Sequence, residues 1–473
     1  MQCKQGRDSI YAFLASAVLA STWLAACTSP SPAPSSIPPH AVIGVQQKQL
    51  TPDFWIARET NASKIVLDRH AIAAQNARLQ QVDPSVHDLD AMPATLAGAD
   101  IRAWIDKLSR YPDEDMFDGE GRKLEKGRFD SLIQAAALEN IPQSQPTRYG
   151  LVVQRADLRS FPALQRGYDS ADDHDIDRFQ ETALFPGTAV VIAHESRDGN
   201  WWFVVSPLYA AWVEKRSIAG GAKEAVLAYT HKEPYLVVTG ATAKTVFTPE
   251  RPDVSQLQLD MGVRVPVLAD WPASQAVNGQ HPYTAHVIEL PVRAADGSLG
   301  FAPALLPRTA DTADDYLPLS RANLLRQGFK FLGERYGWGH SYNARDCSGF
   351  VSDVYRSFGV QLPRNTRDQA VTPAIDHIKF TATDDHEHRL AVLRTLEVGD
   401  LVYIPGHVMM VIGHENGMPY VIHDTTGISY RDASGTVNRV VLNGVSVTPL
   451  TPLLFNRQTP FVDHITSILR VRP

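Results

Sequence analysis

Cysteine is scarce in this sequence: three of its 473 residues are cysteines, at positions Cys3, Cys27 and Cys347. Three cysteines exclude a disulfide-rich scaffold. The longest apolar stretch, residues 10–20, is shorter than the roughly 20 residues that a membrane span needs, and the net charge of −7 lacks the basic excess of nucleic-acid-binding proteins. With 44% hydrophobic and 21% charged residues, the composition is that of globular domains. The length predicts about three or four of them.

The N-terminus departs from this composition. Two basic residues precede the apolar stretch at residues 10–20, and Leu24-Ala25-Ala26-Cys27 follows, an order typical of a secretory signal. The last four residues resemble the bacterial lipobox, which implies that residues 1–26 are removed and that Cys27 carries lipid. Because Thr28 follows, rather than an aspartate of the inner-membrane retention type, we expect an anchor on the periplasmic face of the outer membrane. An ordinary signal peptide with an incidental cysteine is the alternative.

The next two segments carry no catalytic motif. Residues 27–41 are rich in Pro and Ser and lack apolar periodicity, so we expect an extended tether. Residues 42–145 show helical patterning and are predicted as a helical N-terminal domain. Its expected helices lie at residues 61–81, 98–110 and 128–139.

Short strand-like runs begin at Arg148 and predict two small SH3-like β-barrels, at residues 146–225 and 226–315. The runs of the first barrel are 150–153, 189–193, 201–205 and 211–213. Those of the second are 235–238, 262–267, 284–290 and 299–302, with a hairpin turn at Asp296-Gly297. Residues 156–162, 196–202 and 211–213 resemble bacterial SH3-type domains that accompany cell-wall hydrolases.

Residues 316–473 predict an α+β domain, because helices come first and strands afterwards. Ser320 can cap a first helix that stops at Gly333, and a second helix runs from Cys347 to Phe358. The strand-like runs that follow are 400–404, 407–412, 420–423, 439–442 and 468–471. They predict an antiparallel sheet.

Cys347 becomes the one free thiol of the chain if the signal is removed and Cys27 is lipidated. It opens a helix, and a helix N-terminus or a nearby imidazolium lowers the pKa of a thiol. His407 begins a strand so apolar that both its faces must be buried, and His423 follows on the next strand. A hairpin would bring the two rings together as base and orienting group. A buried inert cysteine and structural histidines are the alternatives.

These residues belong to a series of motifs that resembles the NlpC/P60 cysteine peptidases. In chain order the motifs are Tyr336-Gly337-Trp338-Gly339, Asp346-Cys347-Ser348-Gly349-Phe350-Val351, Leu362-Pro363-Arg364 with Gln369, Gly399-Asp400-Leu401-Val402-Tyr403 before His407, and Val421-Ile422-His423. The resemblance implies a papain-like α+β peptidase domain. With the lipobox and the two barrels, the whole chain resembles the Gram-negative lipoprotein branch of this family.

The resemblance also implies roles, with Cys347 as nucleophile, His407 as general base and His423 as the residue that orients the base. Three positions match residues that grip the free amino terminus of the substrate in some members, namely Tyr336, Asp346 and Ser348. The implied reaction is hydrolysis of the bond between γ-D-glutamate and a diamino acid in peptidoglycan stem peptides, through an acyl-enzyme and without cofactor or metal. Small peptides with a free N-terminal alanine fit such a clamp.

Two features depart from the family pattern. His340 follows Gly339 where a second glycine is usual, and the segment 413–420 is longer than the usual hairpin. In some relatives the first barrel adds acidic and aromatic residues to the substrate site. The candidates here are Trp201, Tyr209 and Trp212, with core packing as the alternative.

Two acidic stretches with histidine, residues 172–175 and 384–388, could suggest metal sites, but we expect solvated loops. Asp400 is expected to cap backbone amides. Two other functions stay open. One is a non-catalytic peptidoglycan-binding lipoprotein, and the other is an acyltransferase on the same scaffold, because access of water to the acyl-enzyme decides between hydrolysis and transfer.

Overall fold

The computed structural model describes residues 42–432 and 434–472. The expected signal peptide, the tether and the lipidation site Cys27 lie outside these residues and stay predictions. None of the helices within the described ranges is long and apolar enough to span a bilayer.

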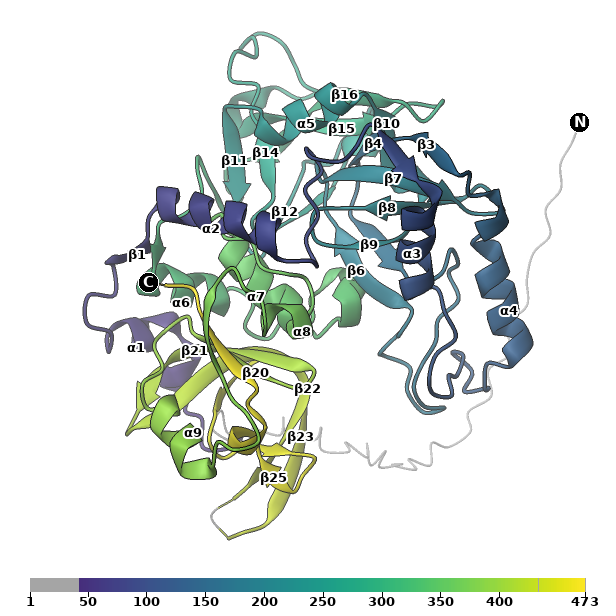
Figure 1. The fold of residues 1–473 in the computed structure, drawn as a ribbon. Helices are drawn as coiled ribbons and strands as arrows, with labels where there is room; N and C mark the ends of the chain where they lie inside the picture. The colour runs from purple at the N-terminus through teal and green to yellow at the C-terminus, as the bar shows by residue number, and fades with distance from the viewer. Residues whose placement is uncertain (1–41, 433, 473) are drawn as a thin grey trace, which may run out of the picture. The chain divides into compact units, whose positions relative to one another are not determined.

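The first barrel is a seven-stranded antiparallel sheet (Figure 1). Its strands, in spatial order, are β10 (Ile218–Gly221), β4 (Arg148–Val152), β7 (Ala189–Glu195), β8 (Trp201–Val205), β9 (Ala210–Glu214), β5 (Ala156–Arg159) and β6 (Gln180–Leu184). All four predicted runs are strands. Every residue of β8 is buried because each face of this strand packs into a different hydrophobic core. Trp202 and Val204 face one core, whereas Trp201, Phe203 and Val205 face another that helices cover.

Residues 42–145 contain helices, as predicted, but they share their cores with neighbouring parts of the chain. The helix α3 (Gly98–Leu108) packs Ile101 and Ile105 onto the outer face of the first barrel. After the helix α4 (Lys126–Ala135), Ala136 joins the same core. The predicted helical domain is therefore corrected to a set of helices that cover other domains.

The start of this segment packs elsewhere. The helices α1 (Pro52–Ile56) and α2 (Arg69–Val82) contribute Trp55 and Leu79 to the core of the C-terminal domain. The strand β1 (Ile65–Leu67) occupies part of the helix predicted at 61–81 and pairs with β18 (Leu319–Ser320). The N-terminal residues therefore complete the C-terminal domain.

The helix α5 (Lys223–His231) crosses the predicted boundary at residue 226 and covers the first barrel, and the residues after it form three small sheets around one core. The sheets are β14 (Arg264–Pro266) with β11 (Tyr235–Val238) and β17 (Thr312–Ala313), β12 (Thr242–Lys244) with β13 (Gln258–Asp260), and β15 (Ala285–Arg293) with β16 (Leu299–Pro307). The predicted hairpin turn joins β15 to β16, and Gly297 takes the positive φ of 89° that this turn needs.

The C-terminal domain contains an antiparallel sheet, as predicted, and β19 (Asp376–Lys379) is a sixth strand beside the five predicted runs (Figure 1). Its strands, in spatial order, are β19, β26 (Ser467–Arg470), β20 (Leu401–Ile404), β21 (His407–Glu415), β22 (Met418–Arg431) and β23 (Val437–Pro449). Along β21, Val408 and Met410 join the core on one face, and Met409 and Val411 join the core on the other. Both faces of this strand are buried, which confirms the prediction.

Local capping positions the helices of this domain. The Ser320 hydroxyl accepts the amide of Asn323 at 3.3 Å and begins α6 (Arg321–Phe329) where predicted. The helix α7 (Cys347–Arg356) begins at Cys347, also as predicted. One prediction was wrong, because residues 384–388 do not form a loop: Asp385 caps the helix α9 (His386–Leu393).

Candidate active site

Cys347 is the first residue of α7 and is 5% exposed. Its Sγ lies 4.0 Å from the carbonyl oxygen of Gly406, and the backbone amide of Val408 donates a hydrogen bond to the sulfur. Gly406 and Val408 flank His407. The structure therefore places the thiol at the start of β21, as the predicted site requires.

The two histidines meet across the β21–β22 hairpin. Nε2 of His407 lies 2.8 Å from Nδ1 of His423. Residues 413–420, the segment that is longer than in the family pattern, extend this hairpin. They include the turn at Asn416-Gly417, where both residues have positive φ. The extra residues therefore do not separate His423 from His407.

A threonine continues this chain of hydrogen-bonding groups. His423 is fully buried, and its Nε2 lies 3.0 Å from the Oγ1 of Thr448 on β23. The sequence predicts part of this strand but not the role of the threonine, because one hydroxyl in a strand gives no sequence signal.

Burial sets the protonation of the resting site. It raises the pKa of the Cys347 thiol to about 12, and the adjacent Asp346 charge acts in the same direction. Burial also lowers the pKa of His407 to about 4 and that of His423 well below its ordinary value. The expected lowering of the thiol pKa is therefore not found, because desolvation outweighs the favourable contributions of the Val408 amide and Arg364.

The residues predicted to bind substrate gather at the start of α7. Asp346 caps the helix by accepting the Gly349 amide at 2.8 Å, and it also accepts the Ser348 hydroxyl at 3.1 Å. Arg364 lies 2.7 Å from the Asp346 carboxylate. Tyr336 is buried. Burial is the main cause that raises the pKa of its hydroxyl, and the charges of Cys347 and Asp346 act in the same direction. The negative charge of Asp346 therefore has a partner inside the protein.

Arg364 also joins this site to the first barrel. Its Nε donates to the hydroxyl of Thr182 on β6. The neighbouring Glu181 accepts hydrogen bonds from Ser160 and Tyr209. Of the three aromatic candidates, Tyr209 thus stands at the site. The other two, Trp201 and Trp212, lie in the barrel core.

The position that departs from the family pattern, His340, is built into the same network. Its φ is +64° and it is 3% exposed. Nδ1 lies 3.0 Å from a nitrogen of Arg364, which can only donate, so Nδ1 accepts and Nε2 carries the proton. That Nε2 has no hydrogen-bond partner. The ring packs against Gly349, where an added Cβ would come within 2.5 Å of it.

Asp424, which follows His423, is a second group that no sequence motif predicts. It is fully buried, and neither carboxylate oxygen has a hydrogen-bond partner. Burial, followed by the charges of Asp346 and Glu334, raises the pKa of Asp424 well above its ordinary value. Burial and the neighbouring charges therefore disfavour the charged form of this carboxyl group, which lies near the thiol.

Arg345, two residues before Cys347, connects the site to the small sheets of residues 226–315. Its guanidinium is fully buried and lies 2.7 Å from the carboxylates of Asp260, Asp353 and Glu334. Asp260 belongs to β13, whereas Asp353 belongs to α7. The same cation therefore contacts both the β12–β13 sheet and the helix that Cys347 opens.

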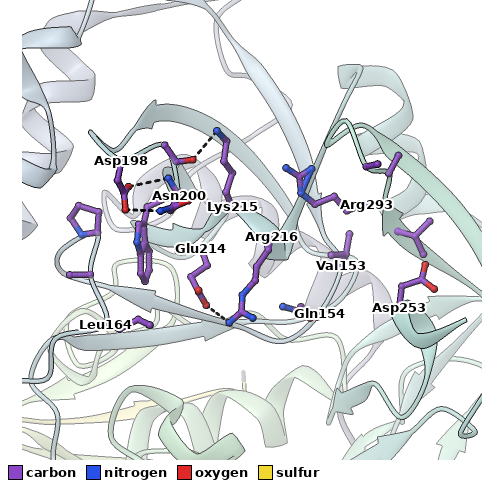
Figure 2. A pocket seen from close by; sticks show the side chains of 17 residues that line it. Val153, Gln154, Leu164, Asp198, Asn200, Glu214, Lys215, Arg216, Asp253 and Arg293 are labelled. Atoms are coloured by element: carbon purple, nitrogen blue, oxygen red, sulfur yellow. Dashed lines mark hydrogen bonds and ion pairs between the residues drawn. The ribbon is translucent and has the colours of Figure 1, made fainter. Parts of the chain in front are cut away.

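A separate cavity of about 890 Å³ is lined by residues of the first barrel and of the segment 226–315, and the predicted site residues are not among them (Figure 2). Its charged groups are largely paired: Arg216 lies 2.7 Å from Glu214, and Lys215 lies 2.8 Å from Glu195. This cavity offers no reactive group comparable to the thiol.

The two acidic stretches do not assemble a metal site. Across residues 42–432 and 434–472, no three His, Cys, Asp or Glu side chains come together as ligands. Asp175 lies 2.8 Å from Arg335 and accepts a hydrogen bond from Asn443, so its loop contacts the C-terminal domain rather than solvent alone. Asp400 accepts the Glu397 amide, which confirms the capping prediction, and it also pairs with Arg472.

The fold and the site define a class of domain, in which a helix-opening cysteine lies beside an antiparallel sheet that carries two hydrogen-bonded histidines. Residues 333–445 match the NlpC/P60 family, and residues 162–214 match an SH3 domain of the SH3b1 type. The C-terminal domain is therefore an NlpC/P60 domain, and the first barrel is an SH3 domain.

Similar proteins agree with this assignment. A gamma-D-glutamyl-L-lysine dipeptidyl-peptidase from Bacillus cereus is 28% identical over 254 residues, which cover 50% of this chain and 66% of the relative, just under two thirds of its length. The structure of an NlpC/P60 endopeptidase from Photobacterium damselae subsp. piscicida has a TM-score of 0.69 at 17% identity and covers 88% of this chain and 96% of its own. That likeness supports the fold.

Proposed function

We propose that this chain is a cysteine peptidase that cleaves the bond between γ-D-glutamate and the diamino acid of peptidoglycan stem peptides. The observation that carries the proposal is the 2.8 Å contact between His407 and His423 beside the buried thiol of Cys347. The NlpC/P60 match and the peptidase relative in B. cereus support the same reaction.

The mechanism uses the thiol as nucleophile. His407 takes the proton from Cys347 as the sulfur attacks the scissile carbonyl carbon, and the amide groups at the start of α7 face the oxyanion that forms. Collapse of this intermediate breaks the C–N bond, and His407 returns the proton to the leaving amine. A water molecule then attacks the thioester, loses a proton to His407 and releases the acid, while the sulfur recovers its proton. His423 orients the His407 ring throughout.

The substrate's free amino terminus would bind between the NlpC/P60 domain and the SH3 domain. Asp346 already pairs with Arg364, so its charge is balanced without substrate. Glu181 has no cation in hydrogen-bond contact and is held by Ser160 and Tyr209. Since burial raises the pKa of Glu181, an ammonium group would favour its charged form. We therefore assign Glu181 to the amine site, beside Tyr336, Asp346 and Ser348.

We further propose that the chain is a lipoprotein of the outer membrane, anchored through Cys27 on the periplasmic face. The support is the sequence Leu24-Ala25-Ala26-Cys27 after an apolar stretch. A Cys27→Ser variant should lose labelling by a fatty-acid analogue and should leave the outer-membrane fraction. Labelling that persists in this variant would exclude Cys27 as the acylated residue.

The activity test uses the full chain and a Cys347→Ala variant with purified muropeptides, and the products are analysed by mass spectrometry. The wild type should release L-alanyl-γ-D-glutamate, and the variant should release none. Cleavage by both proteins would exclude Cys347 as nucleophile. Cleavage by neither, with binding to peptidoglycan retained, would favour a non-catalytic binding protein. New amides formed with added amines in place of acid would favour an acyltransferase.

A further inference from the structure

Three side chains from adjacent strands form one hydrogen-bonded series at the centre of the NlpC/P60 domain. His407 on β21 contacts His423 on β22 at 2.8 Å, and His423 contacts Thr448 on β23 at 3.0 Å. His423 and Thr448 are fully buried. The proton between His423 and Thr448 is therefore shielded from solvent and must be shared by these two side chains.

The reaction fixes which way these protons lie. When His407 takes the proton of the thiol, both of its ring nitrogens carry hydrogen, so its Nε2 can only donate. The Nδ1 of His423 must then accept. A neutral histidine that accepts at Nδ1 carries its proton at Nε2, and that nitrogen faces Thr448.

The opposite arrangement would block the reaction. If His423 donated from Nδ1, Nε2 of His407 would accept, and neutral His407 would carry its proton at Nδ1. Because Nε2 of His407 contacts His423, only Nδ1 of His407 can accept the proton of the thiol. A protonated Nδ1 could not accept that proton. The useful tautomer of His407 thus depends on an acceptor at the far end of the series.

We propose that Thr448 is a positioning residue of this catalytic centre. Its hydroxyl oxygen accepts the Nε2 proton of His423 and so holds His423 in the tautomer that stabilises protonated His407. No bond is made or broken at Thr448, and its hydroxyl keeps its own proton. The inference rests on the proposed roles of Cys347 and His407.

The test compares three variants of the full chain in hydrolysis of a tripeptide of L-alanine, γ-D-glutamate and a diamino acid. Thr448→Val keeps the shape but removes the acceptor, and should lower kcat about 10- to 100-fold, as expected for loss of a hydrogen bond to a charged system, while KM stays within about twofold. Thr448→Ser keeps the hydroxyl and should retain kcat within about threefold of the wild type.

The third variant is a matched control, Thr372→Val. Thr372 is fully buried in the same domain, and its hydroxyl lies 3.4 Å from the Ala374 amide. This variant should leave kcat unchanged. Thermal unfolding of every variant separates loss of fold from loss of reaction, and Thr448→Ala provides a second acceptor-free form if Thr448→Val does not fold.

The outcomes separate this inference from the proposed function. An active wild type with an equally active Thr448→Val would overturn the role of Thr448 alone. So would a Thr448→Ser variant as slow as Thr448→Val, since shape rather than the hydroxyl would then matter. A wild type that releases no product would overturn the proposed function, and the role of Thr448 with it.

Discussion

Arg364 places a guanidinium nitrogen 2.7 Å from the carboxylate of Asp346, and both side chains are buried. A carboxylate directly before a nucleophilic cysteine opposes thiolate formation. The ion pair offsets that effect, and it also fixes the residue that caps α7. The start of the helix and the charge near the sulfur therefore depend on the same contact.

This contact predicts a large effect of Arg364→Met. The substitution leaves Asp346 buried without its counterion, which should lower the free energy of unfolding by about 3–5 kcal/mol. The double variant Arg364→Met/Asp346→Asn should recover part of the loss, because asparagine is neutral and still caps a helix. Urea denaturation measures both proteins, and equal stabilities of the single and double variants would contradict the account.

The protonation of the resting site predicts how Cys347 reacts with pH. With the thiol pKa raised to about 12 and the pKa of His407 lowered to about 4, we expect a neutral thiol and a neutral imidazole in the free protein near neutral pH. Alkylation of Cys347 by iodoacetamide should therefore rise about tenfold per pH unit from pH 7 to pH 10. Cys347→Ala supplies the blank. A rate that is already constant between pH 6 and pH 8 would show a preformed ion pair instead.

Glu181→Gln should weaken binding of substrates with a free amino terminus. Loss of one charge-assisted hydrogen bond should raise KM about tenfold or more, and an N-acetylated peptide should show no change between the two proteins. Asp198→Asn is the control, since Asp198 belongs to the same barrel but lines the other cavity (Figure 2). An equal loss on free and acetylated peptides would remove Glu181 from the amine site.

Asp424→Asn should stabilise the protein at neutral pH. The pKa of Asp424 is raised in the folded state, so its contribution to stability is fully present below the unfolded pKa of about 4 and is lost as pH rises above it. Asparagine does not titrate. Calorimetry at pH 4, 6 and 8 should show a gain in Tm for the variant that grows with pH. A gain that is constant over this range would mean that Asp424 is ionised when folded.

The parts of the site that the sequence predicted depend on local signals. Ser320 and Asp346 cap helices through amides three residues away, and such spacing is visible in the chain itself. The His407–His423 pairing follows from strand alternation and one hairpin turn. The helix α9 was missed because its first turn is polar, although Asp385 is an ordinary cap.

The parts that the sequence did not predict depend on distant partners. Arg364 contacts Thr182 across 182 positions, and Arg345 contacts Asp260 across 85. Residues 42–145 have helical periodicity, which indicates an apolar face but not what covers it. The sequence therefore predicts that apolar side chains of residues 42–145 are buried. It does not predict that some join the core of the C-terminal domain and others the outer core of the first barrel.

The buried cation of Arg345 bears on how such a chain can be assembled from modules. Replacing residues 226–315 by a segment of another protein would remove Asp260 and leave a fully buried guanidinium short of one carboxylate, a change of the kind that costs several kcal/mol. Recombination at the ends of this segment is then tolerated only when the incoming segment restores that carboxylate. Residues 226–315 and the NlpC/P60 domain should therefore be inherited together, as one block rather than as interchangeable units.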